Sequence, residues 1–223
     1  MQENWRYFLY ATLGLLPSVF FGLRFLIQWI SSEQKKKSYV DKTFWRLSFC
    51  GNLLLSIHYF IQIQYLLLII QVANGFIAWR NIDLLNKNKR QIPFKLSLFV
   101  LGLIILVTSL LFFAQSIILS LPIRMLEMPI ALFKKGGSEI SILWHVFGSA
   151  GCLLFASRFW FQWLGAEKSK ESTLSKNFWM ISIFGSVTAL IYFLHIKDWV
   201  SALNYSLGLI PYIRNLILSK NNL

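Results

Sequence analysis

The sequence predicts an all-α membrane bundle of seven transmembrane helices, in which two similar three-helix units flank a single helix. Composition, the length of the apolar stretches and an internal repeat each predict this fold class. Apolar residues make up 56% of the 223 residues and charged residues 14%, whereas soluble domains average roughly 45–50% and 25%. Mean hydropathy is +0.57. This composition excludes a disordered chain, a nucleic-acid-binding domain and an ordinary soluble enzyme.

Seven apolar stretches approach the length of about 20 residues that a spanning helix needs. We expect helices at residues 6–31, 43–62, 65–83, 94–120, 140–165, 177–196 and 199–218. The segment between the fourth and fifth helices is apolar but interrupted by Pro122 and Pro129, which favours an interfacial segment over a further span. We expect the remaining loops to be too short for a soluble catalytic domain.

The net charge is +13, and the distribution of Lys and Arg between the loops predicts how the bundle is oriented in the membrane. Of the 22 Lys and Arg residues, 15 fall in loops on one side and five on the other, while Arg24 and Arg158 lie inside spans. Loops rich in Lys and Arg remain in the cytoplasm. We therefore expect the N-terminus outside and the C-terminus in the cytoplasm.

The strongest pattern is an internal repeat at a constant offset of 134 residues. RFLIQWISSEQKKKSYVDKTFWRLSFCG begins at Arg24, and RFWFQWLGAEKSKESTLSKNFWMISIFG begins at Arg158. Over positions 21–84, 17 of 64 residues are identical to their partners in the second copy. Chance is a poor explanation for an ungapped match of this kind.

Each copy covers three expected spans, and the unmatched fourth helix gives both copies the same orientation. The sequence thus predicts a 3+1+3 arrangement of parallel repeats about an axis along the membrane normal, as occurs in transporters. Residues 5–84 form the first repeat, 85–138 the linker helix and interfacial segment, and 139–218 the second repeat.

The string R-F-x-x-Q-W-x-x-x-E-x-x-K-x-S, followed by F-W-x-x-S-x-x-G and then R-N, occurs in both copies. It resembles the lipid-A-disaccharide synthase N-terminal domain family, whose three-helix unit is similar to the PQ-loop and SWEET transporter group. The resemblance implies a multi-pass protein of the bacterial inner membrane that takes part in lipid A (lipopolysaccharide) biosynthesis. The glycosyltransferase for which the family is named is absent from this sequence, so we expect no synthase activity.

The candidate ligand site consists of Arg24 and Gln28, which share one helix face, and of their counterparts Arg158 and Gln162. An ionisable residue inside a span is a functional hypothesis because burying it is costly. Two interpretations stay open. The two guanidinium groups bind a phosphate or another anion, or each arginine reaches the membrane surface or pairs with a glutamate of its own repeat. For the second interpretation, the plausible partners are Glu33 and Glu167.

For other polar and aromatic residues, a structural role is favoured over ligand binding. We expect Arg80-Asn81 and Arg214-Asn215 to stabilise helix ends. Four tryptophans are expected in an aromatic belt at the cytoplasmic boundary, namely Trp29, Trp45, Trp163 and Trp179.

A weaker pattern predicts a central pocket between the repeats. By resemblance to the sugar transporters, Asn on the third helix of each unit would face the substrate. The candidates are Asn52, Gln71, Asn74, Asn204 and Tyr205. The three histidines lack metal-ligand spacing, and no nucleotide or redox motif occurs, so we expect no metal and no cofactor.

Two functions remain from these patterns. The first is a carrier or flippase-like protein that binds a lipid or glycan intermediate, such as a lipid A precursor or another phosphorylated glycolipid. The second is a non-transporting membrane anchor or accessory module for a separate lipid-A-disaccharide glycosyltransferase. Membrane lipids are expected partners in both cases, and nucleic acid is not.

Overall fold

The computed structural model describes residues 4–36, 38–86, 91–120, 140–169 and 172–220, and every element in these ranges is a helix. In chain order these helices are α1 (Asn4–Lys35), α2 (Lys42–Ile61), α3 (Tyr65–Leu84), α4 (Phe94–Ile118), α5 (Ile142–Ser169), α6 (Lys176–His195), α7 (Trp199–Ser206) and α8 (Leu209–Lys220). The predicted all-helical class is confirmed. The expected interfacial segment with Pro122 and Pro129 lies outside the described residues.

Five of the described helices are long and apolar enough to cross a membrane, namely α1 from Thr12, α3, α4, α5 and α6. The sequence predicts seven such helices. The 20-residue helix α2 is not among the five. The expected span 199–218 is wrong as a single helix, because the structure divides it into α7 and α8.

The division between α7 and α8 has a local cause. Pro211 has no backbone N–H and therefore cannot bond to the carbonyl of Leu207, where the first helix ends. The side chain of Tyr212 also folds back over Gly208 and occupies the space that a Cβ would need. The chain therefore breaks at Leu207-Gly208 and resumes as α8.

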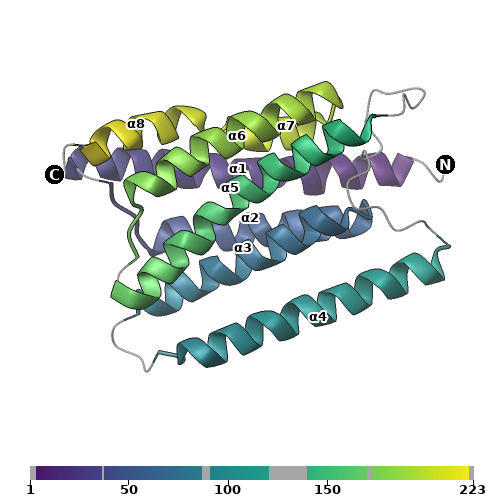
Figure 1. Cartoon of the computed structure of the whole chain (residues 1–223), viewed down its shortest axis with the longest axis horizontal. Coiled ribbons are helices and arrows are strands. Elements are labelled where there is room, and N and C mark those ends of the chain that lie inside the picture. Colours follow the sequence, from purple (N-terminus) through teal and green to yellow (C-terminus); the bar gives the residue numbers. More distant parts are fainter. Residues whose placement is uncertain (1–3, 37, 87–90, 121–139, 170–171, 221–223) are drawn as a thin grey trace.

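Each sequence copy forms its own group of packed helices. Helix α2 packs against α1 and α3, while α6 packs against α5, α7 and α8. Contacts of α3 with α5, and of α1 with α7 and α8, join the two groups. In Figure 1 the end of α1 and the start of α2 lie at the left, with the end of α5 and the start of α6. We call this the lysine-rich end because it carries Lys35, Lys36, Lys42, Lys168 and Lys176.

The two groups repeat the same local stereochemistry at the offset of 134 residues. Asp41 caps α2 and Ser175 caps α6, each accepting a hydrogen bond from the backbone N–H three residues later. The turns that follow these helices place Ile63 at φ 57° and Lys197 at φ 59°. A β-branched residue rarely adopts positive φ. Positive φ at both matched positions, Ile63 and Lys197, indicates that the turns of the two copies fold alike.

Helix α4 lies along one edge of the bundle (Figure 1), and its main contact is with α3. Only Ser97, Leu101, Phe112 and Ser116 of this helix are buried. Its outer face is a continuous apolar surface of large side chains. A helix with so much exposed apolar surface suits a lipid environment.

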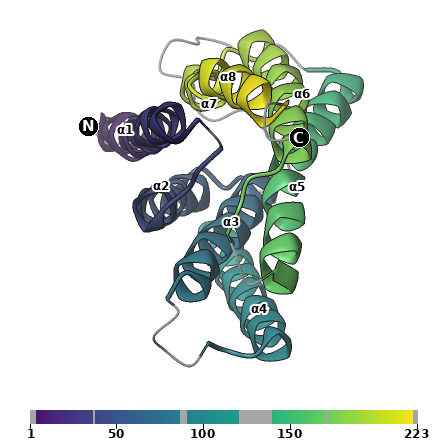
Figure 2. The same cartoon turned by 90° about the vertical axis from the view of Figure 1, so that its left-hand side faces the viewer.

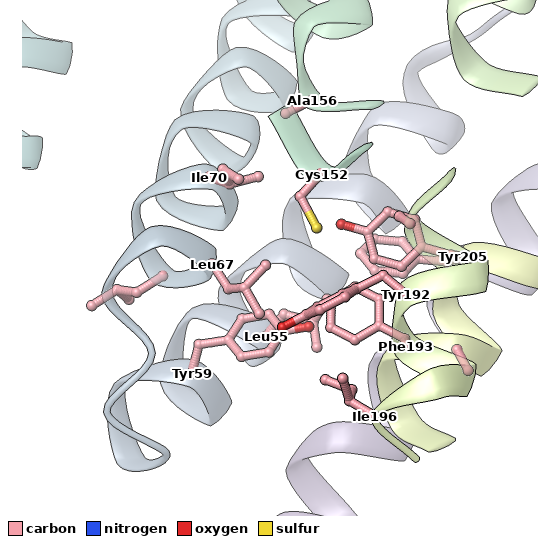
Figure 3. Close-up of a cluster of buried hydrophobic side chains, with 14 of the residues drawn as sticks. Leu55, Tyr59, Leu67, Ile70, Cys152, Ala156, Tyr192, Phe193, Ile196 and Tyr205 are labelled. Carbon is pink, nitrogen blue, oxygen red and sulfur yellow. The ribbon is translucent and has the colours of Figure 1, made fainter. Parts of the chain in front are cut away.

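The core consists of two clusters of buried side chains, and each cluster draws on both helical groups. The first includes Leu55, Tyr59, Cys152 and Tyr192, which converge between α2, α5 and α6 (Figure 3). The second lies toward the lysine-rich end and is rich in aromatic residues. It contains Trp45, Trp163 and Trp179, all fully buried. The expected aromatic belt is therefore wrong for these three tryptophans, which fill the core because the helices of the two groups meet there.

We expect Gly185→Ala to destabilise the protein by about 1–3 kcal/mol. A Cβ at Gly185 of α6 would lie 2.5 Å from the backbone N of Phe155 on α5, and a backbone atom cannot move aside. Thermal unfolding in a fixed detergent measures the change. The control is Gly165→Ala on α5, where nothing lies within 4 Å. Equal unfolding temperatures for the two variants would contradict the close α5–α6 packing.

Candidate functional site

The two intramembrane arginines are buried in the middle of the bundle. Arg24 is 4% exposed and Arg158 is 1% exposed, so neither side chain reaches the surface. Within the described ranges, no carboxylate forms an ion pair with either one. Arg24 Nη1 donates to Ser48 Oγ over 2.8 Å. Nε of Arg24, and Nε and Nη1 of Arg158, have no hydrogen-bond partner in the described part of the chain.

The two glutamates that were expected beside these arginines pair with other arginines instead. Glu167 binds Arg80 through both carboxylate oxygens, with N–O distances of 2.6 and 3.0 Å. Glu33 binds Arg214 in the same two-point manner. Each pair joins the first sequence copy to the second. The pairing within one repeat that the sequence suggested for Arg24 and Arg158 is thus not what the structure shows.

The glutamines also pair across the copies. Gln28 and Asn215 exchange two side-chain hydrogen bonds of 2.8 and 3.0 Å. Gln162 and Asn81 exchange two of 2.8 and 3.1 Å. All four side chains are buried. These residues consequently connect the helical groups, and their amides are occupied by one another.

Tryptophans complete the same crossed pattern at the lysine-rich end. Trp45 Nε1 donates to Ser172 Oγ over 2.8 Å, and Trp179 Nε1 donates to Ser38 Oγ over 3.2 Å. We call the crossed Arg–Glu, Gln–Asn and Trp–Ser pairs the polar lock. Figure 2 shows the molecule from this end, with α1 and α2 on one side and α5 and α6 on the other. The polar lock therefore bridges the two helical groups.

Aromatic rings surround both guanidinium groups, a feature that the sequence analysis missed. Cζ of Arg24 lies 4.4 Å from the ring centre of Phe21 and 4.5 Å from that of Phe25. Cζ of Arg158 lies 3.3 Å from Phe155 and 4.6 Å from Phe159. Phe21 matches Phe155 and Phe25 matches Phe159 at the offset of 134. These identities could have predicted the aromatic surroundings of the two arginines. Cation–π attraction offsets part of the cost of burying each charge.

Both arginines face the same space. Cζ of Arg24 also lies 5.6 Å from the Phe159 ring centre, and Cζ of Arg158 lies 4.6 Å from that centre. The two guanidinium carbons are therefore at most about 10 Å apart, the sum of these distances. The arginines line a cavity of about 30 Å³ between the helical groups. That volume holds one or two water molecules.

The structure brings the expected pocket residues to this cavity. Its lining includes Asn52, Gln71, Asn74, Asn204 and Tyr205. Asn74 Oδ1 is buried and has no hydrogen-bond partner in the described ranges. On the side away from the polar lock, Ser18 Oγ donates to Asn204 Oδ1 over 3.0 Å, and the Tyr59 and Ser201 hydroxyls lie 3.2 Å apart. Bonds between the groups thus lie on both sides of the cavity.

This arrangement can bind an anion. An isolated buried charge costs several kcal/mol, and the cavity concentrates two positive charges that no described carboxylate neutralises. Guanidinium groups bind phosphate and carboxylate groups through paired N–H donors. A negatively charged group in the cavity would satisfy donors that the folded chain leaves unpaired.

The repeats coincide with two matches to one family model. The model of the Lipid A Biosynthesis N-terminal domain matches residues 13–83 and again 147–217, the same offset of 134. The chain belongs to this family. Within the Lipid A Biosynthesis N-terminal domain family, this chain is a tandem of two copies, and the arginine, glutamine and glutamate positions above fall inside both.

Curated relatives of this family member are bacterial proteins named lipid-A-disaccharide synthase. Identity is 34% over 206 residues for the protein of Chlamydia felis and 36% over 204 residues for that of Chlamydia caviae. In both cases the match covers 92% of this chain and 32% of the relative. The chain therefore spans about a third of the length of these relatives. The family and the relatives associate it with lipid A biosynthesis, and no solved structure matches it.

We expect Glu167→Gln to destabilise the folded protein far more than Glu33→Gln. The Arg80–Glu167 pair is buried, with side-chain exposures of 0% and 5%. Leaving a buried charge without a partner costs about 3–5 kcal/mol, and Asp83, which also pairs with Arg80, offsets part of that cost. The Arg214–Glu33 pair has exposures of 42% and 37%, so solvent screens it and its loss has little effect on stability. Denaturation of the two variants in one detergent measures the difference. Equal losses would show that the lock does not depend on the buried pair.

Proposed function

We propose that this chain is an inner-membrane carrier or flippase-like protein that binds a phosphorylated lipid or glycan intermediate of lipid A biosynthesis. One observation carries the proposal. Arg24 and Arg158, from the two sequence copies, are buried beside one cavity and have no carboxylate partner in the described residues. An anionic group of the substrate would supply the missing negative charge.

The arrangement of helices supports a carrier rather than a fixed channel. We propose that α1–α3 and α5–α8 act as two parallel repeats in a SWEET-like 3+1+3 bundle, with α4 as the linker helix. The bundle then has seven crossings, because α7 and α8 together form one. The excess of Lys and Arg orients the lysine-rich end, and with it the C-terminus, toward the cytoplasm and the N-terminus outside.

Alternating access follows from where the hydrogen bonds between the repeats lie. The described contacts join the repeats at the polar lock on one side of the cavity and at Tyr59–Ser201 and Ser18–Asn204 on the other. Because a cavity of about 30 Å³ is too small for a sugar phosphate, loading requires one side to open. Opening the lock exposes the arginines to the cytoplasm, and opening the other side exposes them to the outer half of the membrane.

We expect the double variant Arg24→Gln/Arg158→Gln to lose a bound phosphorylated lipid that the wild-type protein retains. The substitution removes both positive charges and keeps polar side chains of similar length. Native mass spectrometry of the gently solubilised protein measures retention. Unchanged retention would contradict the proposal.

Two controls accompany this variant. Arg46→Gln removes an exposed arginine of α2 and should leave retention as in the wild type. Unfolding of the ligand-free double variant should occur at or above the wild-type temperature, since two uncompensated buried charges are gone. A strong loss of stability would assign the arginines a structural role.

A second function rests on the relatives. They are named lipid-A-disaccharide synthase, and the match covers 32–33% of their length. A module of this kind could anchor such an enzyme at the membrane or deliver lipid to it. This function predicts that the chain co-purifies with the lipid-A-disaccharide glycosyltransferase of its host after crosslinking in intact membranes. Recovery of the chain without that enzyme would count against it.

A further inference from the structure

A groove between α2, α3 and α4 lies beside the arginine cavity and is much larger than it. Its volume is about 370 Å³, within the range of about 300–1,000 Å³ typical of ligand sites. The walls are mostly apolar and include Phe49, Leu53, Phe76 and Ile104. Phe49 and Leu53 are among the exposed large apolar side chains, so the groove opens to the side of the bundle.

The groove and the arginine cavity share a wall one residue thick. Gln71 of α3 lines both spaces. Gly75, one turn further along α3, lines the groove, and a Cβ there would touch Asn52 Cβ at 3.5 Å, which lines the cavity. The side chain of Gln71 has no hydrogen-bond partner within the described ranges, so no bond there holds it in the wall.

From this juxtaposition we propose that the groove holds an acyl chain of the same molecule whose anionic headgroup lies between Arg24 and Arg158. The substrate class is then a phosphate-bearing amphiphile, which enters sideways from the membrane past Gln71. Water-soluble sugar phosphates are excluded as the natural substrate. The inference rests on the proposed function, because it takes the arginines to be the headgroup site.

The different chemistry of the cavity and the groove supports one amphiphilic ligand that occupies both. The cavity presents two cations and amide groups, and the groove presents rings and aliphatic side chains. A phosphate satisfies the first set and an acyl chain the second. A zwitterionic membrane lipid would fill the groove as well, but its headgroup would bring a positive charge toward Arg24 and Arg158.

Photolabelling in nanodiscs tests the inference. The probe is phosphatidic acid with a diazirine at the end of one acyl chain, and the comparison is phosphatidylcholine with the same chain. We expect phosphatidic acid to label the groove segments of α2 and α4 about tenfold more than phosphatidylcholine does. Arg24→Gln/Arg158→Gln should abolish that preference.

Variants of α4 provide the matched control. Ile104→Trp and Val100→Trp fill the groove from α4 and should remove the preferential label. Leu106→Trp adds the same ring to the same helix at a side chain that is 55% exposed and does not line the groove, and it should leave the label unchanged. Unfolding temperatures establish that all three variants are folded.

The outcomes separate the inference from the proposed function. Equal labelling of the groove by both probes means that ordinary lipid fills it, and this overturns the inference. An arginine-dependent preference for phosphatidic acid that maps outside the groove keeps the anion site and also overturns the inference. If phosphatidic acid gains no preference and the arginines have no effect, both fail.

Discussion

Two positive charges buried beside one small cavity are the constraint on which the rest of this structure depends. A guanidinium group inside a bundle must find a carboxylate, reach water or bind a ligand, because its isolated burial costs several kcal/mol. Arg24 and Arg158 have aromatic rings around them, Arg24 donates to the Ser48 hydroxyl, and Tyr212 lies beside both. The motif carboxylates Glu33 and Glu167 bind Arg214 and Arg80 instead, and the proposed function assigns the missing negative charge to a ligand.

The crossed pairing of the repeats explains why those acidic groups are unavailable to the cavity. Each motif glutamate accepts from a tryptophan one turn away and binds an arginine of the other copy, Arg80 on α3 or Arg214 on α8. Each motif glutamine likewise pairs with the asparagine that follows that arginine. A duplicated sequence thereby closes the lysine-rich end with duplicated bonds. These bonds join the two copies at that end, and Ser18–Asn204 and Tyr59–Ser201 join them on the other side of the cavity.

The sequence alone was enough to predict the helical class, the repeat and the shared face of Arg24 and Gln28. Spacing within one copy relates residues on the same helix, and Arg24 and Gln28 are both buried on α1, but the expected glutamate partners within one repeat were wrong. It could not reveal that Glu33 binds Arg214, because these residues are 181 positions apart and meet only when the two copies pack. The burial of Trp45 was missed for a similar reason, since it depends on which helices meet there. The break at Leu207-Gly208 has a local cause, and Pro211 in the sequence could have predicted it.

A cryo-electron microscopy map of the gently solubilised protein, held by a rigid antibody fragment and supplied with its native lipids, tests the central claim most directly. The account predicts a phosphate-shaped density at hydrogen-bonding distance from the guanidinium groups of both Arg24 and Arg158. An empty cavity in the lipid-loaded protein, or a carboxylate of the chain itself on these arginines, would contradict it.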